Sequence, residues 1–261
     1  MTVSTPSSRP AARVRRWPLV LTAAVLWVGL WQVVAMLVGQ PVVVATPWQV
    51  VLALAALIPQ GWFWGTIWTT FWHIGVGFLL AVMLGAGLAG LASQGRWADA
   101  LVAPPIRTLR AVPVVSFIIL LLIWGGSSWL STAVSALMVL PAVFDNLSEG
   151  LSHPPAELCE MAAVFKVPKW RRFRAIIAPG LWPYLMAACR VGVGLAWKAG
   201  VSAEVIGLPS GTIGERLNLA KLYLATGDLF AWTAVIVALG FGTEKLVLWA
   251  TGRGQRAMLG A

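Results

Sequence analysis

Long runs of apolar residues recur along this chain of 261 residues, and they leave few folds open to it. A helix needs about 20 apolar residues to cross the hydrocarbon core of a bilayer. Inside that core every backbone N–H and C=O group must find a partner within the protein, which a helix provides from its own residues. Because 59% of the residues are hydrophobic, a water-soluble fold would expose apolar surface that it could not cover. We therefore expect an all-α fold, a polytopic bundle of membrane-spanning helices.

Six stretches are long and apolar enough to be membrane spans. In chain order they are residues 17–38, 69–92, 106–124, 130–146, 181–201 and 229–250. The third and fourth are short, and only a tight turn at residues 125–128 joins them. A further apolar stretch, residues 47–58, is too short to cross, and we expect it to lie as a helix at the membrane interface.

Lysine and arginine are spread unevenly over the segments between the spans, and cytoplasmic segments normally carry the excess. With the N-terminus inside, the cytoplasmic segments hold Arg9, Arg13, Arg15, Arg16, Arg96, Arg107, Arg110, Lys166, Lys169, Arg171, Arg172, Arg174, Lys245, Arg253 and Arg256. The outer side receives only Arg216 and Lys221. We therefore expect both termini in the cytoplasm, with residues 1–16 as a basic tail and residues 17–261 as one transmembrane domain. This topology also accounts for the net charge of +10, so we expect no nucleic-acid partner.

Residues 154–179 form a compact basic insert between two spans, expected in the cytoplasm. The pattern predicts two short amphipathic helices that are broken at Pro168. Apolar side chains recur at helical spacing on both sides of the break: Leu158, Met161, Ala162 and Phe165 before it, and Trp170, Phe173 and Ile177 after it. The cationic remainder of the second helix consists of Lys169, Arg171, Arg172 and Arg174. Such an insert is shaped to offer its surface to something outside the hydrocarbon.

Three charged residues, Arg190, Lys198 and Glu204, lie in or at the end of the fifth span. A charge at the bilayer centre costs on the order of 3 kcal/mol, so such residues normally face the bundle interior or an aqueous path. One helical face would hold Arg190, Gly194, Trp197, Val201 and Glu204. We regard this face, with Lys198, as the best candidate for lining a path. The alternative is that Arg190 extends to the cytoplasmic interface and that Glu204 already lies in water outside.

Small residues recur every four positions in the second span, at Gly77, Ala81, Gly85 and Ala89. A stripe of small residues lets the backbone of a second helix approach closely. We expect this stripe to serve packing within the bundle.

Several motifs of catalysis and ligand binding are missing from the sequence. The string nearest to a phosphate-binding Gly-x-x-x-x-Gly-Lys-Ser/Thr loop, residues 192–198, lacks the second glycine and lies inside a span. Cys159 and Cys189 have no spacing typical of a disulfide framework or a metal site, and His73 and His153 stand alone. We therefore expect this chain to bind no metal or cofactor and to contain no catalytic residue, ATP hydrolysis included.

The basic insert resembles the cytoplasmic Glu-Ala-Ala loop of binding-protein-dependent ABC transporter permeases. Glu160, Ala162, Ala163 and Phe165 match the opening of that loop, and Pro179 with Pro183 matches its close. The insert departs from the family pattern at two positions, with Lys166 in place of the usual glycine and Ala178 in place of the usual leucine. Pro168 can still break the helix next to Lys166.

The resemblance extends over about residues 60–250. Arg107–Pro113 leading to Ile123-Trp-Gly125, and Arg190 through Trp197 to Ala203-Glu204, are similar to the nitrate, sulfonate and taurine branch of the family. So are residues 210–214 (Ser-Gly-Thr-Ile-Gly) and 228–231 (Asp-Leu-Phe-Ala). The second span has Trp72-His73 where the family commonly has an arginine.

The resemblance implies a permease subunit of the bacterial inner membrane that pairs with a second permease, normally a copy of itself, to form the substrate path. It also implies a cytoplasmic ATPase dimer, which uses ATP-Mg, and an extracytoplasmic solute-binding protein. The ATPase-coupling surface carried over from the family is Glu157, Glu160, Ala162, Ala163, Phe165, Lys166, Trp170, Arg171, Arg172 and Phe173. A path with Arg190 and Lys198 suits a small anion such as a sulfonate, taurine or nitrate.

Two other classes of function remain open from the residues alone. A membrane-embedded scaffold or enzyme subunit could use the basic insert to hold a soluble partner or anionic membrane lipid. An ion-driven secondary transporter is the other alternative, although the 9 acidic residues lie mostly outside the spans and leave few groups for an ion relay.

Overall fold

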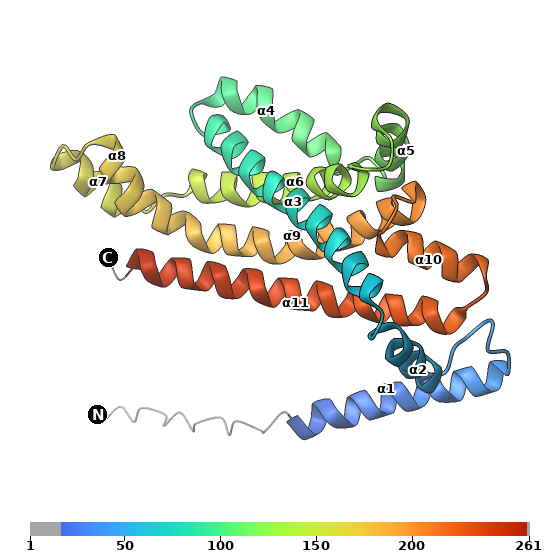
Figure 1. The fold of residues 1–261 in the computed structure, drawn as a ribbon. Coiled ribbons are helices and arrows are strands. Elements are labelled where there is room, and N and C mark those ends of the chain that lie inside the picture. Colours follow the sequence, from blue (N-terminus) through green and yellow to red (C-terminus); the bar gives the residue numbers. More distant parts are fainter. Residues whose placement is uncertain (1–16, 260–261) are drawn as a thin grey trace, which may run out of the picture.

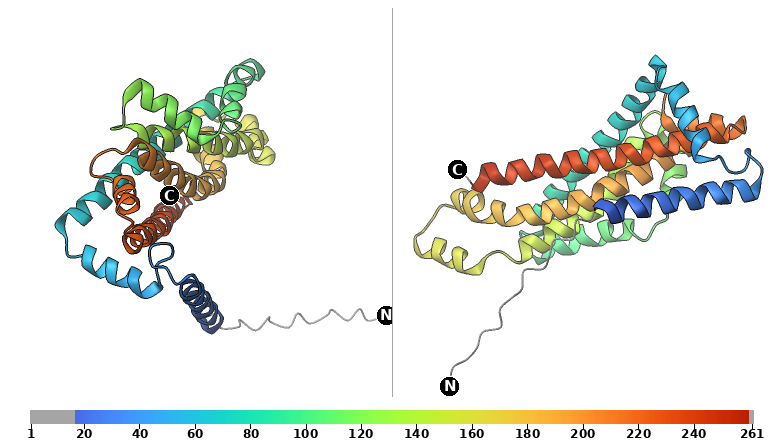
Figure 2. Two further views of the ribbon diagram at one scale, coloured as in Figure 1. Left: turned by 90° about the vertical axis from the view of Figure 1, so that its right-hand side faces the viewer. Right: turned by 90° about the horizontal axis from the view of Figure 1, so that it is seen from below.

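The computed structural model describes residues 17–259, and side chains over residues 21–253. The expected basic tail at residues 1–16 lies outside the described residues. Over the described range the chain is built from helices with no strand; several of the long helices run alongside one another, and the helix at residues 61–92 crosses them at an angle (Figures 1 and 2). This confirms the prediction of an all-α helical bundle.

The helices follow one another with short connections. In chain order they are α1 (Trp17–Val38), α2 (Pro47–Leu57), α3 (Gly61–Ala92), α4 (Arg96–Leu109), α5 (Val114–Gly125), α6 (Leu130–Ser152), α7 (Ala156–Val164), α8 (Lys169–Arg172), the π-helix η1 (Phe173–Ile177), α9 (Ala178–Gly207), α10 (Ile213–Leu222) and α11 (Thr226–Leu259).

Five helical segments are long and apolar enough to cross a membrane, namely those of α1, α3, α6, α9 and α11. The expected third span at residues 106–124 is not one helix, and this prediction was wrong. The chain there forms two helices, α4 and α5, which meet at 98°. Pro113 stands at the start of α5, and a proline disfavours helical conformation in the residue before it. Counted as one broken span, the pair brings the crossings to the six expected from the sequence.

The two ends of the bundle differ in charge, as the sequence predicted. The C-terminal ends of α3, α6 and α11 lie at the same end as α7 and α8, whereas α10 lies at the opposite end (Figure 1). The first end therefore holds the basic insert together with Arg96, and the second holds Arg216 and Lys221 on α10. This arrangement agrees with a cytoplasmic insert and an outward-facing α10.

The helices around the insert run differently from the prediction. α7 ends at Val164 and α8 begins at Lys169, so the break at Pro168 is confirmed. The second short helix is not separate, however, because α8 continues through η1 into α9 as one helical segment of 39 residues. Pro179 lies inside this segment, two residues after η1, and supplies no backbone N–H there. The insert is thus joined directly to a membrane-spanning helix.

The core of the bundle is formed by α6, which packs against α3 on one side and α9 on the other. Gly77, Ala81, Gly85 and Ala89 all lie on the buried face of α3, which confirms their expected packing role. A Cβ atom added to Gly85 would lie 2.8 Å from Cγ1 of Val143 on α6. The two helices can therefore approach this closely only because residue 85 has no side chain.

We predict that Gly85→Leu destabilises the bundle, because the new side chain cannot fit between α3 and α6. Overpacking of this kind typically costs about 1–3 kcal/mol. Gly87→Leu is the matched control, since it lies on the same helix with nothing within 4 Å of an added Cβ atom. Thermal unfolding of the purified protein in detergent should show a lower midpoint for the first variant only. Equal midpoints for the two variants would contradict the packing argument.

Candidate functional site

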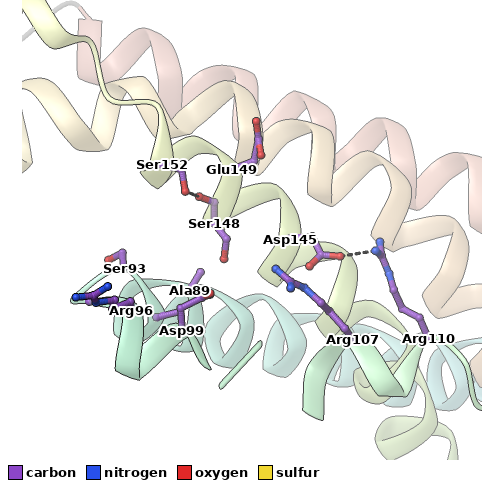
Figure 3. Close-up of a pocket in the computed structure, with 12 residues that line it drawn as sticks. Ala89, Ser93, Arg96, Asp99, Arg107, Arg110, Asp145, Ser148, Glu149 and Ser152 are labelled. Atoms are coloured by element: carbon purple, nitrogen blue, oxygen red, sulfur yellow. Dashed lines mark hydrogen bonds and ion pairs between the residues drawn. The ribbon is translucent and has the colours of Figure 1, made fainter. Parts of the chain in front are cut away.

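A polar cavity of about 640 Å³ opens at the end of the bundle that holds the insert (Figure 3). It lies between the C-terminal end of α3, the helix α4 and the C-terminal half of α6. Its walls carry three arginines, three carboxylates and three serines: Arg96, Arg107, Arg110, Asp99, Asp145, Glu149, Ser93, Ser148 and Ser152. A concave site with several convergent polar groups is the usual form of a binding or transit site.

An ion pair between Arg110 and Asp145 crosses this cavity. Arg110 follows the last turn of α4, directly before the bend into α5, and Asp145 lies on α6. Figure 3 shows the side chain of Arg107 reaching toward the same carboxylate. The pair therefore ties the bend of the broken span to the central helix. The sequence placed both arginines in a cytoplasmic segment, but it gave no sign that Asp145 would meet them.

Glu204 forms a second polar junction, at the opposite end of the bundle. Its side chain is fully buried, and its Oε2 accepts hydrogen bonds from the Thr70 hydroxyl (2.9 Å) and from the backbone N–H of Gly214 (3.3 Å). The Thr70 oxygen in turn accepts from the backbone N–H of Ile213 (2.9 Å). Since Ile213 and Gly214 begin α10, the carboxylate lies at the N-terminus of that helix, where a negative charge is favourable.

This junction brings four helices together. Thr70 comes from α3, Glu204 from α9 and Gly214 from α10. The hydroxyl of Ser131 on α6 also faces the carboxylate, without the geometry of an ordinary hydrogen bond. A Cβ atom on Gly214 would collide with the backbone of α9 at Glu204. Glycine is thus required where α10 begins.

The residues of α9 that were expected to line a path fall into a buried group and an exposed group. Trp197 and Glu204 point into the bundle, and the indole of Trp197 packs near the ring of Phe71. Arg190, Gly194 and Lys198 are exposed, at successive turns of the same side. A Cβ atom on Gly194 would meet nothing within 4 Å. The open side of α9 therefore carries two cations and a glycine, which is unlike a surface made for lipid alone.

The insert presents most of the expected coupling residues on its surface. Among them Ala162 is buried and Arg172 is half-buried, and the others are exposed. Phe165 is 75% exposed and Trp170 is 70% exposed, which leaves large apolar side chains without cover. Clustered exposed apolar side chains commonly mark an interaction surface.

Lys166 occupies a position that strains a residue with a side chain. Its φ of +50° lies in the left-handed region. The N–H of Lys166 donates to the carbonyl of Ala163, and the N–H of Val167 donates to that of Ala162, which is the pattern of a Schellman cap closing α7. Glycine normally ends a helix in this way. The turn expected at the family glycine is therefore formed here, with lysine in it.

No group of three His, Cys, Asp or Glu side chains among the described residues could hold a metal ion. The polar chemistry of these sites rests on arginine, lysine, carboxylate and hydroxyl side chains. Such groups can bind and steer small charged solutes.

Comparison with known proteins finds, for most of the chain, the family that the basic insert resembles. The family described as "Binding-protein-dependent transport system inner membrane component" matches residues 77–243. An aliphatic sulfonates transport permease protein of Bacillus subtilis is 27% identical over 92% of this chain and 87% of its own length. A nitrate import permease protein of Synechococcus elongatus is 27% identical, with coverage of 86% and 85%. A taurine transport system permease protein of Escherichia coli is 28% identical, with 88% of each chain covered.

We predict that Glu204→Ala destabilises the outer end of the bundle. The substitution leaves the Thr70 hydroxyl and the Gly214 N–H without their acceptor, and each buried unsatisfied group costs about 1–3 kcal/mol. Glu204→Gln should lose less, since its amide oxygen can still accept. Ser202→Ala, at an exposed position of the same helix, is the control and should unfold like the parent protein in detergent. Equal losses for Glu204→Ala and Ser202→Ala would refute the junction.

We also predict that Lys166→Gly stabilises the turn after α7. Removing the side chain relieves the left-handed backbone, a gain of about 1 kcal/mol. Lys166→Ala is the control, because it removes the charge but keeps the strain. Hydrogen–deuterium exchange at the amides of residues 166 and 167 should slow in the glycine variant alone. Equal slowing in both variants would assign the effect to charge instead.

Proposed function

The chain belongs to the family of binding-protein-dependent transport system inner membrane components, and from this we propose that it couples substrate passage to a separate cytoplasmic ATPase. It is an ABC importer permease, a multi-pass protein of the bacterial inner membrane and not an enzyme in its own right. This confirms the resemblance drawn from the basic insert. We further propose how this chain contacts its partners.

The observation that carries the proposal is the exposed insert at one end of a continuous helix. The side chains of Phe165 and Trp170 are exposed and can serve as apolar anchors for a partner. The surrounding lysines and arginines can attract that partner and fix its orientation. A partner held there acts on α9 directly, because α8, η1 and α9 form one helical segment. We propose that this partner is an ATPase dimer and that it, rather than this chain, uses ATP-Mg.

We propose that two copies of the permease form the path, each contributing the open side of α9. Arg190, Gly194 and Lys198 are exposed within a helix long enough to span, and charges at such depth favour water or a partner over lipid. A cavity of about 400 Å³ between α9 and α11 continues this side and is lined by Lys198 and Glu244. The polar cavity with the Arg110–Asp145 pair would then serve the cytoplasmic exit.

The substrate class proposed is a small anion such as a sulfonate, taurine or nitrate. Two observations support it: the cations Arg190 and Lys198 on the open side of α9, and relatives named for sulfonates, nitrate and taurine. A solute-binding protein would deliver the anion at the outer end of the bundle, where α10 lies. Membrane lipid would cover the remaining apolar surface.

We predict that Arg171→Glu together with Arg172→Glu uncouples the ATPase. The double substitution reverses charge on the insert, and loss of docking energy at such a surface should lower substrate-stimulated ATP hydrolysis by about tenfold or more. The measurement uses the complete importer in proteoliposomes, with uptake and hydrolysis followed together. Arg253→Glu is the control, since it is exposed at the same end of the bundle but lies outside the insert. Normal stimulated hydrolysis in the double variant, with the ATPase still bound, would contradict the proposal.

A further inference from the structure

An apolar groove of about 400 Å³ lies at the cytoplasmic end of the bundle, beside the insert. Its walls come from α3, α6, η1 and the first turns of α9, and every residue that lines it is apolar or glycine. The residues that matter here are Met83, Ala86, Leu151, Phe173, Leu181 and Trp182. Met83 is 63% exposed and Phe173 is 43% exposed, so the groove is open to its surroundings. A hydrocarbon chain of the bilayer can therefore enter it from the side.

The chain around Phe173 is strongly cationic. Residues 154–179 hold five basic residues and two acidic ones. None of these five cations forms an ion pair within the described part of the chain. The Nε atom of Arg172 is buried and finds no hydrogen-bond acceptor among the described residues. Because a buried donor without an acceptor is costly, a phosphate at this place would satisfy it.

We infer that this groove is a binding site for an anionic phospholipid, with one acyl chain along Ala86 and Phe173 and the phosphate held by Arg172. The apolar wall and the cation are adjacent in the chain, since Phe173 directly follows Arg172. Basic pockets between spans at the cytoplasmic surface are suited to anionic headgroups. The inference rests on the proposed function only in taking this end of the bundle as cytoplasmic.

The site has a consequence for the join between insert and span. The five residues of η1 form a π-helix, a wide turn that is uncommon and occurs frequently at functional sites. Phe173, the first residue of this turn, contributes to the groove wall. A bound acyl chain therefore packs against the segment through which the insert meets α9.

The test measures lipid binding to the full-length chain by native mass spectrometry, after delipidation in detergent. Phosphatidylglycerol and phosphatidylcholine with identical acyl chains serve as probes. We expect one tightly bound phosphatidylglycerol per chain and weaker binding of phosphatidylcholine. Arg172→Gln should weaken phosphatidylglycerol binding roughly fivefold and leave phosphatidylcholine unchanged. Arg96→Gln, at the polar cavity instead of the groove, is the matched control for charge.

The groove itself is tested by Ala86→Trp, which fills it and should weaken binding of both lipids. Leu79→Trp is the control for bulk, since Leu79 is 58% exposed on the same helix and does not line the groove. Equal affinity of the parent protein for the two lipids, or full phosphatidylglycerol binding by Arg172→Gln, would overturn the headgroup assignment. Unchanged binding by Ala86→Trp would overturn the place of the acyl chain.

A second copy of the chain is the competing occupant of the groove. Ala86→Cys distinguishes the two, because both native cysteines are buried. Disulfide-linked dimers of this variant in native membranes would show that another protomer covers the groove, and they would overturn the inference. The lipid readout needs no ATPase, so its failure leaves the coupling proposal intact. Because Arg172 belongs to both surfaces, Arg171→Glu alone separates the two proposals: it should uncouple the ATPase and leave phosphatidylglycerol binding unchanged.

Discussion

Close backbone contact among α3, α6 and α9 is the constraint on which the other elements depend. Lipid is as apolar as leucine, so helices in a membrane associate through tight packing and polar contacts rather than through a hydrophobic force. Gly85 brings α3 against α6, and Gly200 brings α9 against Ser135 and Ile74. Two further parts are tied to this core by polar contacts. Arg110–Asp145 ties the bend of α4 and α5 to α6, and Glu204 ties α10 to α3 and α9.

Hydropathy was sufficient to predict the bundle, because a bilayer allows almost no other solution for a chain with six long apolar stretches. It could not predict how prolines act within each stretch. Pro113 stands at the bend of 98° between α4 and α5, whereas Pro179 lies inside the helical segment of α8, η1 and α9 and leaves it unbroken. Pro141 and Pro183 also lie inside helices, so a proline alone does not decide where a helix ends. The surrounding fold decides it, and the sequence alone therefore misplaced the third span and separated α8 from α9.

The site residues divide in a similar way. Charge inside a span drew attention to Arg190, Lys198 and Glu204, and helical spacing placed Arg190 and Glu204 on one face. Oε2 of Glu204 instead lies inside the bundle and accepts a hydrogen bond from Thr70, which lies 134 residues away in the chain. No local spacing can reveal such a partner, and the same holds for Asp145 beside Arg110. The family pattern did indicate the turn at Lys166. A left-handed helix cap depends on the local sequence, and the glycine that is usual at this position is typical of such a cap.

In the proposed importer, α9 is the element through which the two ends of the bundle communicate. It begins in the insert and forms one segment of 39 residues with α8 and η1. It ends near Glu204, at the N-terminus of α10. A straight helix transmits displacement well along its length, so compliance would concentrate where the backbone is irregular. The π-turn at Phe173–Ile177 is such a place, and the groove and its cations lie against it. A lipid bound there would stiffen the join, so that force applied to the insert would move α9 as a whole instead of being absorbed in the wide turn.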